Sequence, residues 1–406
     1  MNFAIGWRQV AIVFYMLALV TGILFSSYSI VSTPIGREFH ASHGLQMAGI
    51  GAIMLVGAPM SPVVGGWLDR YSFRHLLAIS GALVAAGLLA LSFAQAMWQV
   101  IAIYALFMAV PSVICGPMGA SALLMRWFVK RRGRAMGIAV AGLSAGSFVF
   151  PVLIQQLIEG LDWRAALRVL ALLVGATLVP AALLLTVERP SDRGLHPDGA
   201  EAPPPVVPSQ REHGAKVPAR EVISDRNFWL AALALGLPLS AGTGVTSNIV
   251  LVAADIGVAA TFAAIVMSAI AVASASGKVV FAAIGDRFDP RILLFAGMIM
   301  FSAGLAILAF APSLPLLFTG AALVAFGSGL LNPMWGVLFP LAFDHAIVGR
   351  VMGLAMSVSM VLAVIAPVLV GAMRDATGAY EAPFLLYGAL ILICAVSVRA
   401  MRIRTV

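Results

Sequence analysis

The chain has 406 residues, of which 61% are hydrophobic and only 10% are charged. Soluble domains carry about 25% charged and about 45–50% apolar residues, so no soluble core would bury this much apolar surface. A soluble enzyme, a nucleic-acid-binding protein and a disordered protein are therefore excluded as classes, and the composition predicts a polytopic membrane protein. The net charge of +8 has to be placed along the chain before it indicates a partner.

Twelve apolar segments follow one another, each long enough for a membrane-spanning helix, which needs about 20 residues. Helix is expected because lipid offers no partner to an open strand edge. The alternating segments of a membrane barrel are absent, and the first segment is too long for a signal-peptide core. Cys115 and Cys394 lie inside such segments and indicate neither a disulfide nor a metal site. The expected spans are 9–32, 46–66, 75–94, 98–123, 135–158, 165–186, 227–253, 259–284, 291–311, 314–341, 350–372 and 383–400.

The basic residues predict an orientation through the positive-inside rule. With both termini in the cytoplasm, the inside segments hold 20 of the 25 Lys and Arg residues and the outside segments hold 4. The positive charge therefore indicates topology at an anionic lipid surface and no nucleic-acid partner. We expect a multi-pass protein of the cell inner (plasma) membrane with cytoplasmic N- and C-termini.

One long hydrophilic stretch, from Glu188 to Arg226, separates the first six spans from the last six. Its seven prolines and mixed charge predict an irregular linker. The expected domains are an N-terminal six-helix bundle (1–187), a cytoplasmic Pro-rich linker (188–226) and a C-terminal six-helix bundle (227–406).

The two halves match each other at an offset of 216 or 217 residues. The matched clusters are Asp69-Arg70 with Asp286-Arg287, Arg74 with Arg291, Leu76-Leu77 with Leu293-Leu294, Pro117-Met118 with Pro333-Met334, Gly133-Arg134 with Gly349-Arg350, and Pro151 with Pro367. Clusters that include charged loop residues are not a chance feature of apolar sequence. Parallel duplicated halves are typical of a transporter that rocks about a site between them.

Two stretches resemble the major facilitator superfamily. The first, GGWLDRYSFRHLL at 65–77, is similar to the family signature G-x-L-a-D-R-x-G-R-K-x-x-L, with Ser72 and Phe73 departing from it. The matching residues are Gly65, Asp69, Arg70 and Arg74. The second, at 126–167, resembles the monocarboxylate and oxalate/formate branch, which carries W-F-x-x-R-R-x-x-A-x-G, a Gly-rich helix and then G-W-R; Asp162 replaces the Gly of G-W-R. The resemblance covers the whole chain and implies an all-α fold of twelve transmembrane helices in two pseudo-symmetric halves.

The resemblance implies a gating role for the charged loops, because in the family such networks hold the cytoplasmic side shut. The alternative is a turn that only sets topology. The expected gate and signature residues are Gly65, Asp69, Arg70, Arg74, Asp286, Arg287, Arg134 and Arg350.

The fifth span carries small residues at helical spacing, Gly137, Gly142 and Gly146, which predict close helix packing. In the antiporter motif of drug exporters a Gly would directly precede Pro151. Phe150 stands there instead, which disfavours a drug-efflux interpretation.

Lys278 is the one Lys or Arg residue expected inside a span. It precedes Asp286 by eight residues, which places it about 12 Å deep at 1.5 Å per residue. A lysine at the bilayer centre costs about 2.5–3.5 kcal/mol, so the position favours a functional charge that attracts an anion in a water-filled cavity; snorkelling is the alternative. The resembled branch carries an Arg at this spacing that pairs with the substrate carboxylate. The resemblance implies the same role for Lys278, without the bidentate geometry of Arg.

No acidic or histidine proton relay is expected inside the spans, because the 17 carboxylates and six histidines fall in loops or at helix ends. Ser274 stands one turn before Lys278, where proton-coupled animal members of the branch carry an Asp. Three couplings stay open: Lys278 itself exchanges a proton, the substrate carries the proton, or one anion exchanges for another.

The resemblance further implies that the first, fourth, seventh and tenth spans line the cavity. Polar or aromatic residues within these spans are Tyr28, Ser112, Thr246, Ser247, Asn248, Asn332 and Trp335. Hydrogen bonding between helices is the alternative for the two asparagines, and anchoring at the membrane interface is the alternative for Tyr28.

The sequence therefore predicts a secondary transporter that moves a small organic anion, a monocarboxylate, by alternating access, through proton symport or anion exchange. The alternative is an exporter of neutral or amphiphilic compounds. A membrane enzyme or a sensor ranks lower, because no catalytic cluster and no additional domain is visible. We expect no cofactor and no metal; the expected partners are the organic anion, protons under two of the three couplings, and the lipid bilayer around a monomer.

Overall fold

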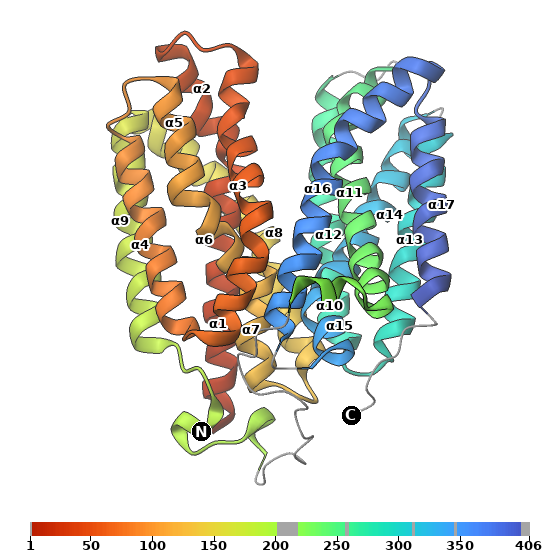
Figure 1. The fold of residues 1–406 in the computed structure, drawn as a ribbon. Coiled ribbons are helices and arrows are strands. Elements are labelled where there is room, and N and C mark those ends of the chain that lie inside the picture. Colours follow the sequence, from red (N-terminus) through yellow and green to blue (C-terminus); the bar gives the residue numbers. More distant parts are fainter. Residues whose placement is uncertain (1, 201–217, 256–259, 311–312, 345–346, 399–406) are drawn as a thin grey trace. The chain divides into compact units, whose positions relative to one another are not determined.

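The computed structural model describes residues 2–200, 218–255, 260–310, 313–344 and 347–398 (Figure 1). Within these ranges every regular element is a helix, and twelve helical segments are long and apolar enough to cross a membrane. Each segment overlaps one of the twelve expected from the sequence, so that prediction is confirmed. The chain forms two compact units: unit 1 comprises Met1–Ala215 with Ala346–Gly353, and unit 2 comprises Lys216–His345 with Leu354–Val406.

Unit 1 holds the first six spans, three of which are assembled from more than one helix. Its α-helices are α1 (Asn2–Val20), α2 (Tyr28–Glu38), α3 (His43–Arg70), α4 (Phe73–Leu91), α5 (Met97–Ile103), α6 (Ala109–Ile114), α7 (Pro117–Trp127), α8 (Arg132–Gly160) and α9 (Trp163–Pro180). Three π-helical segments join them or extend them: η1 (Thr21–Ser26), η2 (Tyr104–Met108) and η3 (Ala181–Leu185). Two short 3-10 helices follow, η4 (Pro190–Arg193) and η5 (Pro197–Gly199).

Unit 2 holds the last six spans. Its elements are α10 (Ala219–Ile223), α11 (Arg226–Asp255), α12 (Ala260–Ile284), α13 (Pro290–Ala309), α14 (Leu314–Leu331), η6 (Asn332–Met334), α15 (Trp335–Ala342), α16 (Val348–Thr377) and α17 (Glu381–Val398). The tenth span consists of α14, η6 and α15, and the change of helix type falls on Asn332 and Pro333.

Local sequence explains where several helices begin. The side chain of Ser72 accepts a hydrogen bond from the backbone N–H of His75 at the start of α4, and Asp162 caps α9 by accepting from Ala165 N–H at 2.7 Å. In unit 2, Asp289 accepts from Arg291 N–H at 2.8 Å and caps α13. Such caps satisfy N–H groups that have no partner inside the helix.

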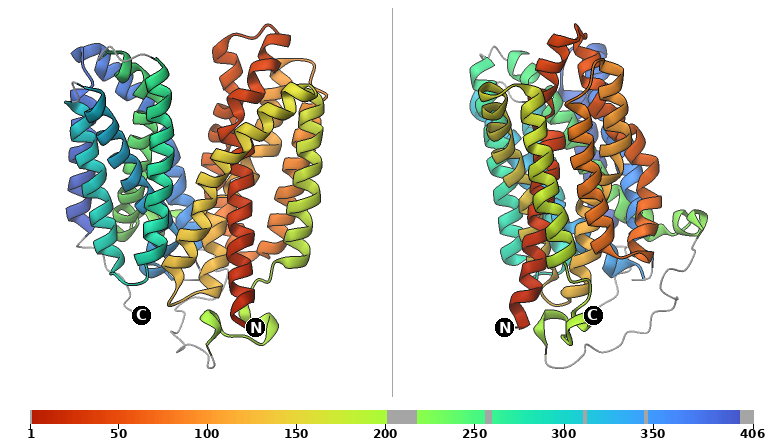
Figure 2. Two further views of the ribbon diagram at one scale, coloured as in Figure 1. Left: turned by 180° about the vertical axis from the view of Figure 1, so that it is seen from behind. Right: turned by 90° about the vertical axis from the view of Figure 1, so that its left-hand side faces the viewer.

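Small residues allow α1 and α8 to pack at backbone distance (Figure 2). A Cβ atom added at Gly142 would overlap the carbonyl oxygen of Phe14, and one added at Gly146 would overlap that of Ala18. The close packing predicted for these two glycines is therefore confirmed, and it places η1 and α2 directly beside α8.

Candidate functional site

Lys278 lies inside α12, six residues before the helix ends, with 5% of its surface exposed. Among the described residues two other charged side chains are buried, Arg132 and Asp344, and these stand at the start of α8 and just after α15. Lys278 is thus the buried charge that lies deepest within a span in the described part of the chain. Lys278 takes part in an interaction within the structure and is not an isolated group.

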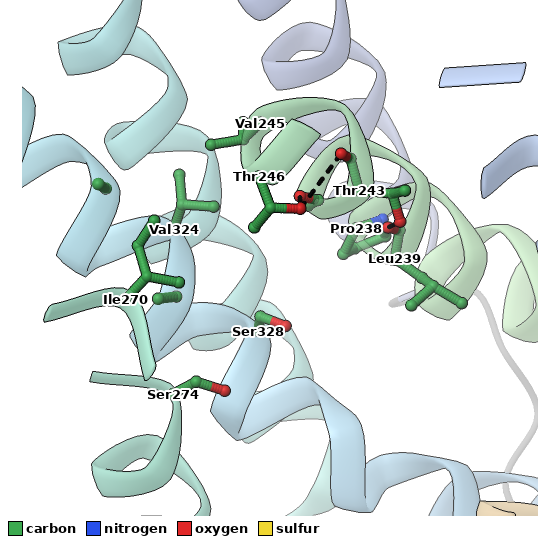
Figure 3. A pocket seen from close by; sticks show the side chains of 12 residues that line it. Pro238, Leu239, Thr243, Val245, Thr246, Ile270, Ser274, Val324 and Ser328 are labelled. Atoms are coloured by element: carbon green, nitrogen blue, oxygen red, sulfur yellow. Dashed lines mark hydrogen bonds between the residues drawn. The ribbon is translucent and has the colours of Figure 1, made fainter. Parts of the chain in front are cut away.

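A cavity of about 220 Å³ opens in unit 2 between α11, α12 and α14 (Figure 3). Its wall combines four hydroxyl side chains, those of Thr243, Thr246, Ser274 and Ser328, with apolar groups. The apolar lining residues are Pro238, Leu239, Gly242, Val245, Ile270, Ala321, Val324 and Ala325.

The cavity offers neutral hydrogen-bonding groups and no charge. Thr243 donates to the carbonyl oxygen of Leu239 at 2.9 Å, and Thr246 donates to that of Gly242 at 2.9 Å. Because these hydroxyl protons are used within α11, the oxygen atoms remain available as acceptors on the cavity side. The wall therefore suits an apolar ligand body that carries a hydroxyl donor or a bound water molecule.

Lys278 and Asn332 each lie one helical turn beyond a serine that lines the cavity. Residues four apart share a helix face, so Lys278 follows Ser274 on α12 and Asn332 follows Ser328 at the end of α14. Lys278 itself is not a lining residue; it lies about 6 Å along the helix from Ser274, at 1.5 Å per residue. A helical side chain leans toward the N-terminus of its helix, which for Lys278 is the direction of the cavity.

Two glycines allow α12 and α14 to pack closely at this side of the cavity. A Cβ atom at Gly277 would overlap the carbonyl oxygen of Phe326, and one at Gly329 would overlap that of Ser274. Larger residues at either position would push α12 and α14 apart and widen the side of the cavity on which Ser274 and Ser328 lie (Figure 3).

The candidates in unit 1 are packed in its interior. Tyr28 is 2% exposed, donates from its hydroxyl to the carbonyl oxygen of Gln46 at 2.6 Å, and packs edge-on against Tyr104. Ser112 is buried and donates to the carbonyl oxygen of Ala109 at 2.7 Å. Both side chains therefore have hydrogen-bond partners within unit 1.

The remaining candidates in unit 2 differ in their surroundings. Asn248 is buried and donates to Gly244 O at 2.9 Å, and the buried Trp335 stacks on Phe339. Asn332 is half-buried and donates from Nδ2 to Ser328 O at 2.8 Å. Of these three, Asn332 is the one placed next to the cavity wall, through its bond to the lining residue Ser328.

Thr243 and Ser328 line the cavity and were not among the sequence candidates. Their only signal is spacing: Thr243 precedes Thr246 by three residues, and Ser328 precedes Asn332 by four. Hydroxyl residues are common in membrane helices as partners of their own backbone, so spacing alone does not single them out.

Asp69, near the end of α3, binds backbone groups at the start of α16. Its carboxylate accepts hydrogen bonds from Gly349 N–H at 2.8 Å and from Arg350 N–H at 2.9 Å. Gly65 lies one turn earlier, where an added Cβ would overlap the carbonyl oxygen of Gly349. The short segment Ala346–Gly353 belongs to unit 1, so this contact lies within that unit.

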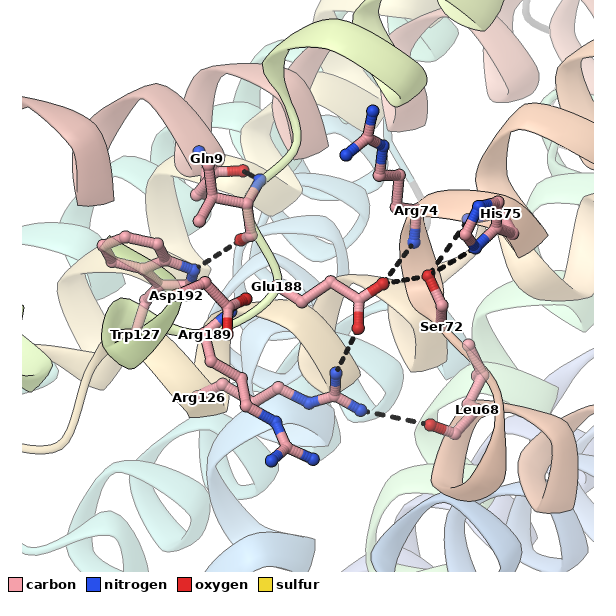
Figure 4. Close-up of polar contacts among 11 residues, drawn as sticks. Gln9, Leu68, Ser72, Arg74, His75, Arg126, Trp127, Glu188, Arg189 and Asp192 are labelled. Carbon is pink, nitrogen blue, oxygen red and sulfur yellow. Dashed lines mark hydrogen bonds and ion pairs between the residues drawn. The ribbon is translucent and has the colours of Figure 1, made fainter. Parts of the chain in front are cut away.

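A second cluster lies at the same end of unit 1 (Figure 4). Arg126 forms an ion pair with Glu188 at 3.6 Å and donates to the carbonyl oxygen of Leu68 at 3.3 Å. Arg70 is exposed at the last residue of α3, and Arg74 is exposed in the first turn of α4. The exposed Arg134 lies over the Trp7 ring at 5.5 Å.

The matching signature loop of unit 2 follows α12. Asp286 and Arg287 are exposed in the turn that follows α12. Within the described ranges no group of three or more His, Cys, Asp or Glu side chains is placed to hold a metal ion.

Replacement of Asp69 by Asn is expected to loosen the start of α16. Asn keeps one oxygen acceptor but loses the charge, and hydrogen bonds to a charged group contribute about 1.5–3 kcal/mol each. Amide hydrogen exchange of the peptide covering Gly349 and Arg350 should accelerate about tenfold or more. The Asp375→Asn variant, at an exposed carboxylate in unit 2, is the matched control; equal exchange in both variants would contradict the assignment.

A family model and several solved structures match this chain over nearly its whole length. A family model described as Major Facilitator Superfamily matches residues 13–248 and 239–405. Similar solved structures include the E. coli fucose:proton symporter FucP (TM-score 0.75, 16% identity, covering 99% of this chain and 100% of that chain) and the proton:xylose symporter XylE (TM-score 0.73, 13% identity, 99% and 97%). At these identities the likeness concerns the fold alone, and it confirms the expected architecture.

Sequence relatives include monocarboxylate transporter 13 of Rattus norvegicus, 26% identical over 95% of this chain and 86% of its own length. Monocarboxylate transporter 11 of Homo sapiens is 28% identical over 95% of this chain and 81% of its own length. The fujikurins efflux protein of Gibberella fujikuroi is 32% identical, but over only 37% of this chain. The chain is a multi-pass membrane transporter, and it belongs to the Major Facilitator Superfamily.

Proposed function

We propose that this transporter moves a small organic anion, a monocarboxylate, and that Lys278 supplies the positive charge that holds the carboxylate. The observation that carries the proposal is the position of Lys278, a buried cation inside α12 one helical turn from a neutral cavity. A charge at this depth is costly to bury and is retained where it has a function. An anion beside the ammonium group would offset that cost.

The cavity supports a small substrate. Its volume of about 220 Å³ falls below the roughly 300–1,000 Å³ of pockets for drug-sized ligands. In the proposed binding mode the carboxylate points toward Lys278 and Asn332, and the rest of the molecule contacts the apolar wall and the hydroxyl oxygens of Thr243 and Thr246. A short aliphatic acid with a hydroxyl group fits both features.

The relatives support the same class. Two that match nearly the whole chain are named monocarboxylate transporters, whereas the efflux relative matches little more than a third of it. The alternative, export of neutral or amphiphilic compounds, therefore has weaker support. The excess of basic residues in the inside segments supports cytoplasmic termini and a cytoplasmic gate at Asp69, Arg70 and Arg74, and these remain part of the proposal.

A thermal-shift screen tests the substrate class directly. The purified full chain is heated with formate, acetate, lactate or pyruvate at two pH values, and with lactamide as a neutral analogue of lactate. A ligand at 100 times its Kd stabilises the folded state by about 2.7 kcal/mol. We expect at least one carboxylate to raise the Tm, and lactamide to leave it unchanged.

The same screen separates the two candidate classes. Stabilisation by neutral or cationic amphiphiles, with no response to any carboxylate, would favour the exporter and contradict the anion proposal. Stabilisation by lactate that persists in a Lys278→Gln variant would leave the substrate class intact and reject Lys278 as its ligand.

A further inference from the structure

Most of the segment 187–199 belongs to the predicted irregular linker, and the structure packs it against the helices of unit 1. Both backbone groups of Val187 are hydrogen-bonded: its N–H donates to Gln9 Oε1 at 3.1 Å, and its carbonyl oxygen accepts from Trp127 Nε1 at 2.8 Å. The chain is thus anchored within two residues of Leu185, the last residue of the sixth span.

Glu188 attaches the segment to the loop between α3 and α4. Its carboxylate pairs with Arg126 at 3.6 Å, accepts from the backbone N–H of Arg74 at 3.3 Å, and accepts from the hydroxyl of Ser72. Ser72 and Arg74 stand in the signature loop that also contains Asp69. One end of the segment therefore holds the loop that binds the start of α16.

Asp198 attaches the other end to the turn between α7 and α8. Its Oδ2 accepts from Val129 N–H at 2.9 Å and from Lys130 N–H at 2.8 Å, and its Oδ1 accepts from Arg131 N–H at 3.3 Å. Consecutive backbone N–H groups of this kind form a concave site for an anion. Here the anion is a carboxylate of the chain itself.

The backbone between the two anchors bends sharply. Asp198 has φ 58°, a left-handed conformation that is uncommon outside glycine, and Gly194 has φ 65°. Arg189 N–H donates to Asp192 Oδ2 at 3.0 Å and closes the first turn. The unfavourable conformation of Asp198 persists because its carboxylate is held in place by three donors.

We propose that residues 187–199 form a strap that joins the signature loop to the α7–α8 turn, so that both loops move as one piece during transport. Glu188 and Asp198 are its two anchors and act as positioning residues. Release of Asp198 should loosen the distant contact between Asp69 and the amides of Gly349 and Arg350. The strap makes no use of Lys278 or the cavity, so it does not depend on the identity of the substrate.

Variants at Asp198 separate hydrogen bonding from backbone strain. Asn and Gly both tolerate positive φ, but Asn retains one acceptor oxygen and Gly retains none. Trypsin cuts after Arg193, which is exposed within the strap, whereas Arg189 is protected by the proline that follows it. In the purified full chain, Asp198→Gly should accelerate cleavage between Arg193 and Gly194 about tenfold or more, with Asp198→Asn in between.

Hydrogen exchange of the peptide that covers Gly349 and Arg350 gives the second readout. We expect Asp198→Gly to accelerate it severalfold, and Glu159→Gln, which removes an exposed carboxylate from α8, to change neither readout. Unchanged cleavage in Asp198→Gly would overturn the strap. Faster cleavage with unchanged exchange would overturn its link to the signature loop. Neither measurement uses a ligand, so failure of the carboxylate screen would leave both intact.

Discussion

Replacement of Lys278 by Gln is expected to reduce monocarboxylate uptake at low substrate concentration by about 30-fold or more. Loss of one partner from a buried, hydrogen-bonded charge pair costs about 2–5 kcal/mol, and each 1.4 kcal/mol is about a factor of ten. Uptake is measured in vesicles with the radiolabelled acid that gives the largest thermal shift. Lys278→Arg keeps the charge but changes its geometry, so it should retain more uptake than the Gln variant.

Lys130 provides the control for this substitution. Its side chain is exposed between α7 and α8, and Asp198 of the strap accepts from its backbone N–H, which the substitution keeps. Lys130→Gln should therefore transport at the wild-type rate. If Lys278→Gln, present in the membrane at the same level, also transports normally, the proposed role of Lys278 is wrong.

The second large effect is expected at Gly146, where Ala should destabilise the protein by about 1–3 kcal/mol. The added methyl group would overlap the backbone oxygen of Ala18, and a carbonyl group of a packed helix has no rotamer by which to move aside. Gly146→Ala should therefore lower the Tm of the purified protein, although Ala is the better helix former by about 1 kcal/mol.

Gly175 on α9 supplies a control with the opposite expected sign. A Cβ atom there would meet only the Cβ of Ala85, at an ordinary 3.5 Å. Gly175→Ala should leave the Tm unchanged or raise it. A parallel response of the two variants in one detergent would show that close packing of α1 and α8 is not what requires glycine at position 146.

The twelve spans, the duplicated halves and the packing role of Gly142 and Gly146 were predictable because they depend on composition, spacing and size. The rotation of each helix about its axis was not. Spans that are apolar on all sides lack the one-sided pattern that shows which face is buried. Tyr28 and Ser112 therefore gave the same sequence signal as residues beside the cavity, although the structure buries both inside unit 1.

The cavity wall was only partly visible in the sequence for a related reason. Thr243, Ser274 and Ser328 carry no charge, and a hydroxyl group in a membrane helix satisfies itself on its own backbone. Lys278 stood out because a buried charge is costly, whereas a buried hydroxyl is not. The strap is not predictable from composition, because its prolines and glycines are typical of an irregular linker. The structure shows that Glu188 and Asp198 bind backbone groups of two loops in unit 1.

The π-helix η2 explains why the internal repeat has two offsets. Residues 69–77 match unit 2 at an offset of 217, and the fourth span still begins at that offset, Met97 opposite Leu314. At Pro117 opposite Pro333, and again at Pro151 opposite Pro367, the offset is 216, so the stretch from Met97 to Pro117 holds one residue more than the stretch from Leu314 to Pro333. The additional residue falls within 97–116. In this stretch the fourth span contains the π-helix η2 (Tyr104–Met108), whereas the corresponding part of the tenth span, α14, is continuous α-helix. A π-turn takes up an inserted residue without rotating the helix on either side. In this stretch the two halves thus differ in length by one residue, and Tyr104, with its contact to Tyr28, lies on the π-turn that accommodates it.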